Sequence, residues 1–234
     1  MVNDSLYPPE SPDEARRLRS HTTLEALQIP YNLHLPVAIP EDEAKIRTPM
    51  EIAERVVTMY GVCVYSELLS TGESRQEIKF YLDKIDKILA GQFQTLMTPQ
   101  ESAYLAMEAP QQRVIAKFGW RYECCYVLLW ALGAIDELGY PSQICDVPRL
   151  AGIVWNIDSV KRFAAEAKLR TTTEILDTAD LILRYNWACV DARIKNHPAP
   201  ANLDGEVVVE WHYAINWLVG MDDNADWDHT QTNT

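Results

Sequence analysis

The chain has 234 residues, of which 47% are hydrophobic and 24% are charged; this is ordinary globular usage and excludes a wholly disordered protein. Its 34 acidic residues against 21 basic ones give a formal charge of -13, which argues against nucleic acid or an anionic membrane as main partner. Only nine glycines are present and no two of them form a GxG motif, which excludes the phosphate-binding loops of Rossmann and P-loop proteins.

Targeting and redox features of the sequence predict a cytoplasmic protein. The stretch from Met1 to Glu14 is acidic and proline-rich, without the basic start and apolar run of a signal peptide. The longest apolar stretch, Cys124 to Ile135, is far shorter than the roughly 20 residues that a membrane-spanning helix needs. The cysteines are odd in number and form no CxxC motif, so we expect reduced thiols at Cys63, Cys124, Cys125, Cys145 and Cys189.

Helix starts are marked by a repeated pattern of a hydroxyl residue, a proline and, three positions after the hydroxyl, a glutamate. The pattern begins at Ser11, Thr48 and Thr98, and Thr171 has it without the proline. The hydroxyl can accept the N3 amide, the glutamate can accept the N-cap amide, and proline at N1 removes an amide that has no helical partner. With the helical spacing of apolar residues, these starts predict helices at 12–27, 49–69, 74–89, 99–107, 111–138, 147–155, 159–167, 172–195 and 205–220.

The segments between these helices show no strand pattern, so we predict an all-α protein. Residues 31–39 are bounded by prolines and favour a buried extended segment over a strand of a sheet. We expect a single compact multi-helix bundle, with irregular and orthogonal packing around a long, buried central helix at 111–138. Its parts are a flexible N-terminus at 1–11, one helical domain at 12–220 and an acidic C-terminal tail at 221–234. From residue 201 onward the chain has seven acidic residues and no lysine or arginine, which favours a solvated tail.

Several short motifs together resemble one known family. They are Arg47 with Glu51 to Arg55, Trp120 to Glu123, Leu128 to Gly133, Leu169-Arg170, Glu174 to Asp177, Asp180-Leu181, Arg184, Trp187-Ala188 and Ala214 to Leu218. The joint pattern is similar to the bacterial domain-of-unknown-function 4272 family, from about residue 16 to the C-terminus. The resemblance implies a soluble, single-domain, largely helical bacterial protein, and it implies no activity. The chain departs from the family pattern at Trp211, where a basic residue is expected, and in its less acidic ending from Asp228 to Thr234.

Polar side chains among tryptophans on three predicted helices form the candidate site. On helix 172–195, Asp177, Asp180 and Arg184 share one face, and Asp180 and Arg184 have the spacing of an i, i+4 ion pair. The full polar set is Arg121, Glu123, Asp177, Asp180, Arg184, Glu210, His212 and Asn216, with an aromatic wall of Trp120, Trp130, Trp187 and Trp217. A purely structural interpretation is that the charged members pair with one another, because an unpaired buried charge is costly.

A functional interpretation places the same residues around a pocket between helices 111–138, 172–195 and 205–220. Paired carboxylates would shift each other's pKa values there, and His212 would transfer protons. The histidines form no HxxxH or HxxE pair, so we predict no metal site, and no motif indicates a cofactor. No GxSxG motif is present, and the cysteines lie in apolar helical stretches typical of packing residues rather than of nucleophiles.

Three functions are compatible with these features. The first is an acidic helical binding protein that neutralises a basic protein partner, which the negative charge late in the chain favours. The alternative is an enzyme or a small-ligand binder that uses the tryptophan-walled pocket. The third is assembly with copies of itself through apolar positions on helix 12–27. The sequence leaves open whether the protein is an enzyme, and it does not indicate an oligomeric state.

Overall fold

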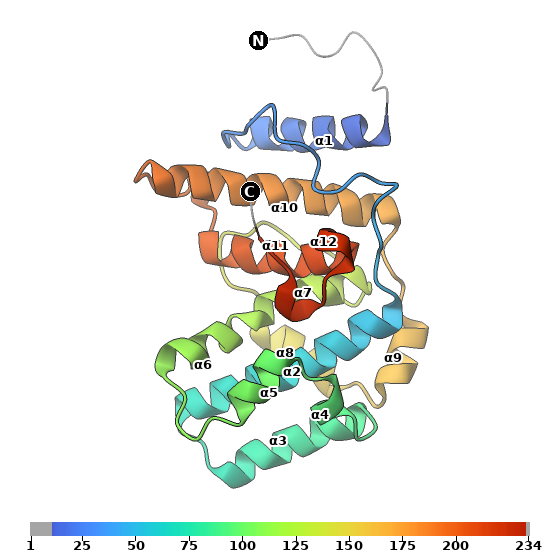
Figure 1. Ribbon diagram of the computed structural model, residues 1–234, viewed down its shortest axis with the longest axis vertical. Coiled ribbons are helices and arrows are strands. Elements are labelled where there is room, and N and C mark those ends of the chain that lie inside the picture. The colour runs from blue at the N-terminus through green and yellow to red at the C-terminus, as the bar shows by residue number, and fades with distance from the viewer. Residues whose placement is uncertain (1–10, 233–234) are drawn as a thin grey trace.

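The computed structural model describes residues 11–232, apart from the side chains of Asp222 and Asn224, and within this range it has helices and no strand (Figure 1). The all-α prediction is therefore confirmed. The helices are α1 (Pro12–Ala26), α2 (Pro49–Thr71), α3 (Arg75–Ile88), α4 (Phe93–Leu96), α5 (Pro99–Leu105), α6 (Gln112–Gly119), α7 (Arg121–Ala131), α8 (Val147–Trp155), α9 (Val160–Glu166), α10 (Thr172–Ile194), α11 (Gly205–Val219) and α12 (Met221–Asn224), with 3-10 helices η1 (Pro200–Asn202) and η2 (Trp227–His229). None of these helices is both long and apolar enough to cross a lipid bilayer.

The N-terminal segment at 1–11 was predicted to be flexible. Residues 1–10 of it lie outside the described part of the chain.

The predicted helix starts are observed at the expected residues. The hydroxyls of Thr48, Thr98 and Thr171 each accept the N3 amide while the N3 glutamate accepts the N-cap amide, so the capping box is complete at all three. Ser11 accepts the amide of Glu14. These local bonds explain why the starts could be located from the sequence alone.

The prediction of one long central helix at 111–138 is wrong, because the chain forms two shorter helices there, α6 and α7. Between α6 and α7 the amide of Glu123 donates to the carbonyl of Trp120, a tight turn that follows Gly119, a poor helix former. At the other end Gly133 adopts φ +73°, and the amide of Ala134 donates to Leu129, which ends α7. The helix at the centre of the bundle is instead α2, which contacts α3, α6, α7 and α9.

The helices are arranged as a stack from α1 at one end to α3 at the other (Figure 1). Along this stack α1 packs against α10, α10 against α11, α11 against α7, and α7 against α2. The main hydrophobic core lies around α2, α7 and α11, and a smaller cluster including Leu24, Tyr185 and Val208 joins α1, α10 and α11. Every candidate site residue lies on α7, α10 or α11 or in the turn between α6 and α7, so the site belongs to the part of the stack from α10 to α7.

The segment at 221–234, predicted as a solvated acidic tail, folds back onto the bundle over its described part. It forms α12 and η2, and Trp227 is only 5% exposed. The carbonyl of Gln231 accepts the side-chain amide of Asn216, and that of Thr232 accepts the side-chain amide of Asn186. The run of acidic residues favoured a solvated tail. The buried indole of Trp227 and these two hydrogen bonds hold the described part of the segment against the bundle instead.

Candidate functional site

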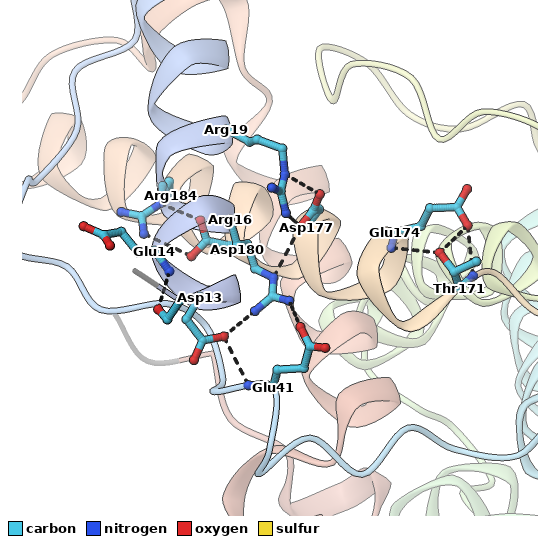
Figure 2. Close-up of polar contacts among 11 residues, drawn as sticks. Asp13, Glu14, Arg16, Arg19, Glu41, Thr171, Glu174, Asp177, Asp180 and Arg184 are labelled. Atoms are coloured by element: carbon cyan, nitrogen blue, oxygen red, sulfur yellow. Dashed lines mark hydrogen bonds and ion pairs between the residues drawn. The ribbon is translucent and has the colours of Figure 1, made fainter. Parts of the chain in front are cut away.

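The eight polar residues predicted to share one pocket divide into separate groups. Asp180 and Arg184 form the predicted i, i+4 pair, fully buried, with Arg184 Nε 2.9 Å from Asp180 Oδ2 (Figure 2). Nη2 of Arg184 also approaches the carbonyl oxygens of Leu35 and Pro36, at 3.5 and 3.4 Å. This pair therefore fixes the 31–39 segment against α10, as the structural interpretation expects of buried charges.

Asp177, which shares that face of α10, binds α1 instead of the other candidates. Both of its carboxylate oxygens accept hydrogen bonds from Arg19, and Arg16 Nε lies 3.3 Å from Oδ1 (Figure 2). Arg16 is 1% exposed and also pairs with Asp13 and Glu41. The bond from Asp177 raises the pKa of the Arg19 guanidinium. Sequence reasoning missed both arginines, although their i, i+3 spacing on the predicted helix 12–27 was a usable signal.

Arg121 and Glu210 form another separate group, together with Cys124. Glu210 Oε2 accepts from Arg121 Nη1 at 3.0 Å and from the Cys124 thiol at 3.1 Å. The guanidinium of Arg121 also lies 3.9 Å from the ring centre of Tyr213. Burial opposes the charge on Arg121, but Cys124 and Glu210 together raise its pKa. Burial raises the pKa of the Cys124 thiol and Glu210 adds to this, so the thiol is no activated nucleophile.

Glu123 lies away from both arginines of the predicted network. Its carboxylate accepts from the backbone amide of Cys145 at 2.6 Å and from Trp211 Nε1 at 3.0 Å. Burial raises the pKa of Glu123, and these two donors partly oppose that shift. Trp211 therefore has a structural partner at the position where the family pattern suggests a basic residue.

His212 and Asn216 form a further group with Asn186 and the C-terminal segment. Nδ2 of Asn186 lies 3.1 Å from His212 Nδ1 and 3.3 Å from the carbonyl oxygen of Thr232. Burial lowers the pKa of His212 to about 4, so the ring is neutral near pH 7. This arrangement does not favour the predicted role of His212 in proton transfer. Asn186 was not predicted from the sequence. The one feature that could have indicated it is its position as a polar residue between two aromatic ones, Tyr185 and Trp187.

The predicted aromatic wall is also dispersed. Trp130 lies beneath the guanidinium of Arg170, and Trp187 packs against the smaller hydrophobic cluster. Trp217 contacts Trp227 edge to face, with ring centres 5.4 Å apart. Of these four tryptophans, only Trp120, in the turn between α6 and α7, lines a large cavity between α10 and α11.

A cavity of about 750 Å³ lies between α10 and α11, two of the three helices between which the pocket was predicted. On α10 it is lined by a face with i, i+3, i+4 and i+7 spacing, and on α11 by residues at i, i+3 and i+4. The lining residues are Asn186, Cys189, Val190 and Arg193 on α10, Gly205, Glu206, Val209 and Glu210 on α11, with Trp120 and the connecting residues Asn196, His197 and Ala199. We call this cavity the Trp120 groove. Of the predicted site residues it contains Trp120 and Glu210.

A second hollow of about 470 Å³ lies between the 38–45 segment and the end of α11. Its charged lining residues are Asp42, Glu43 and Asp223 against Lys45, whose amine lies 3.2 Å from Asp223. We call it the acidic hollow. Within residues 11–232, the acidic hollow included, no three His, Cys, Asp or Glu side chains lie close enough to hold a metal ion.

Comparison with known proteins identifies one family. The family model described as Domain of unknown function (DUF4272) matches residues 16–230. No curated protein and no solved structure matches the chain. Because the match covers nearly the whole chain, this protein belongs to the DUF4272 family.

Proposed function

We propose that this protein binds a small organic molecule in the Trp120 groove. The observation that carries the proposal is the groove itself, because its volume of about 750 Å³ falls within the range of known ligand sites. Val190, Val209 and Trp120 provide apolar contact area, while Arg193 and Glu206 provide charges on opposite helices. Ligand sites combine apolar contact area with convergent polar groups, and the groove offers both kinds of side chain. The unpaired cysteines support a reducing compartment such as the cytoplasm.

The test is retention of small molecules by the purified full-length chain. The protein is dialysed against a metabolite extract, and retained compounds are identified by mass spectrometry. We expect Val209→Arg to abolish retention, because Val209 lies on the groove wall and is already 36% exposed, so a long side chain can enter the groove without disturbing the core. The matched control is Ile194→Arg, at a site 72% exposed that does not line the groove. Equal retention by both variants and the parent protein would contradict the proposal.

The second candidate is the binding of a basic protein partner, and the acidic hollow favours it. The hollow combines carboxylates with an apolar floor that includes Ile39 and Met221, which suits the aliphatic stem and charged head of a lysine or arginine. Complexes formed in this way weaken as added salt screens the charges. The partner would be captured from a lysate of the native host at low salt and released at high salt.

A charge-matched pair of variants separates the hollow from the overall charge of the protein. The triple variant Asp42→Asn, Glu43→Gln, Asp223→Asn should lose the partner. The control variant Glu108→Gln, Asp136→Asn, Glu137→Gln removes the same charge from exposed positions outside the hollow, and it should keep the partner. Equal loss in both variants would mean that general charge, and not the hollow, binds the partner.

A further inference from the structure

We propose that the ligand of the Trp120 groove carries a protonated amine, which lies at the inner end of the groove among Trp120, Asn186 and Glu210. This inference rests on the proposed function and names the chemical class of its ligand. The inner end is the part near the middle of α10, whereas Arg193 and His197 lie near the connection between α10 and α11. Each of the three inner groups favours a cationic hydrogen-bond donor, for a different reason.

Asn186 contributes a buried acceptor without a donor. The residue is 1% exposed and lines the groove, and its Oδ1 has no hydrogen-bond partner among residues 11–232. Its orientation is fixed by the carbonyl oxygen of Thr232, which can only accept, so the NH2 group must face Thr232 and His212. A buried amide oxygen without a partner is costly, and because Oδ1 is itself shielded from solvent, a ligand N–H in the groove would satisfy it only after a small shift of the surrounding wall.

Glu210 contributes a carboxylate oxygen and a negative charge. Arg121 and Cys124 both donate to Oε2, which leaves Oε1 without a donor in the described part of the chain. Arg121 offsets the charge of Glu210, but Glu206 lines the same groove four residues earlier on α11, and no described cation lies within ion-pair distance of it. Like charges at i, i+4 repel each other, so a cation bound beside them is favoured.

Trp120 contributes an indole ring that is only partly buried. The negative face of an indole attracts ammonium groups and also provides apolar contact for the body of a ligand. The distance from Asn186 to Arg193 along α10 corresponds to seven residues, or roughly 10 Å at the rise of an α-helix. The groove therefore suits an amine whose apolar body is about two helical turns long and extends between Val190 and Val209.

The experiment uses three amines with different bodies: hexylamine, 3-phenylpropylamine and tryptamine. Each is paired with its N-acetyl derivative, which keeps the body and removes the charge, and with a carboxylic acid of similar size. Binding to the full chain is measured by calorimetry at pH 7. We expect at least one amine to bind about tenfold more tightly than its uncharged and acidic counterparts, as a charge-assisted hydrogen bond implies.

Shape-conserving variants test the position of the amine. Glu210→Gln should weaken amine binding about tenfold, Glu206→Gln should weaken it less, and Glu108→Gln, an exposed residue outside the groove, should leave it unchanged. Val209→Arg should abolish it, because the guanidinium would take the place of the amine. Equal binding of amine, amide and acid, or equal binding by the parent and Glu210→Gln, would overturn the inference.

Failure of this inference is distinguishable from failure of the proposed function. If no amine of the set binds while Val209→Arg still abolishes retention of a metabolite, the ligand class is wrong and the groove remains a ligand site. If no probe binds and Val209→Arg retains the same compounds as the parent protein, both proposals fail.

Discussion

The imidazole of His212 makes the stability of this protein depend on pH. It is 1% exposed, and burial lowers its pKa from 6.5 to about 4. In the unfolded chain the ring takes up a proton as the pH falls through 6.5, whereas in the fold it does so only near pH 4. Between these values the unfolded state binds more protons, so stability is lost as the pH falls. The lowering of the pKa from 6.5 to about 4 corresponds to roughly 3 kcal/mol of unfolding free energy. Urea unfolding at pH 7 and at pH 4.5 should therefore show most of this loss.

A His212→Asn variant isolates this contribution. The asparagine oxygen can accept from Asn186 in place of Nδ1, but it does not titrate. Glu123 acts in the opposite direction, because its raised pKa makes the fold bind a proton more readily than the unfolded chain does. Since Glu123 is present in both proteins, we expect the variant to lose less stability than the parent on acidification. The same loss in both would show that His212 does not cause the dependence.

At the level of single residues, the sequence predicted partners that lie on one helix and missed those brought together by packing. Asp180 and Arg184 are one turn apart, and their predicted ion pair is confirmed. Asp177 lies on the same face, but its partners Arg16 and Arg19 come from α1, more than 150 residues earlier. No spacing rule on α10 could reveal them, because they depend on the docking of α1.

Among the elements, the end of α7 depends on a close contact at Gly133. A Cβ atom added there would lie 2.6 Å from the carbonyl oxygen of Lys168, and the residue has φ +73°. We expect Gly133→Ala to destabilise the fold through both effects, the backbone conformation alone costing about 1–2 kcal/mol. Gly139→Ala is the matched control, because Gly139 has φ +78° and nothing within 4 Å of the added Cβ. Chemical unfolding should give a loss at least 1 kcal/mol larger for Gly133→Ala than for the control; equal losses would mean that Lys168 moves aside freely.

The same region explains why the helix at 111–138 was predicted too long. Its apolar residues continue with helical spacing beyond Ala131, so the pattern gives no reason to stop. The carbonyl oxygens of Ala131 and Leu132 instead accept hydrogen bonds from the backbone amides of Arg170 and Lys168, respectively. These donors come from a segment far along the chain, and a pattern within 111–138 cannot include them.

For the molecule as a whole, the Trp120 groove shares two helices, α10 and α11, with the predicted pocket but few of its residues. The sequence predicted a tryptophan-walled pocket between three helices, and Trp120 and Glu210 do line the Trp120 groove. Helical spacing shows which residues share a face, but it does not show which face remains open between two neighbouring helices. Asn186, Val190 and Val209 were missed for this reason, because their faces read as ordinary helix packing.

The C-terminal segment contacts both the main hydrophobic core and a residue that lines the Trp120 groove. The ring of Trp227 lies near the guanidinium groups of Arg55 and Arg121, whose Cζ atoms are 5.2 and 5.7 Å from the ring centre. A few residues later, Thr232 accepts the side-chain amide of Asn186, which lines the groove. Loosening the segment at Trp227 should therefore remove one of the two partners that hold Asn186 in its orientation.

Trp227→Ala tests this connection without changing any residue that lines the groove. We expect a loss of about 3–5 kcal/mol in unfolding free energy, as for other buried aromatic truncations, together with weaker amine binding under conditions where the variant is still folded. Trp155→Ala is the control: Trp155 is half-buried, contacts Tyr81 and Lys84, and lies far from the groove on α8. It should lower stability and leave amine affinity unchanged. Hydrogen exchange should show faster exchange at 225–232 in Trp227→Ala alone; if amine affinity falls equally in both variants, general destabilisation and not the loss of this segment controls the groove.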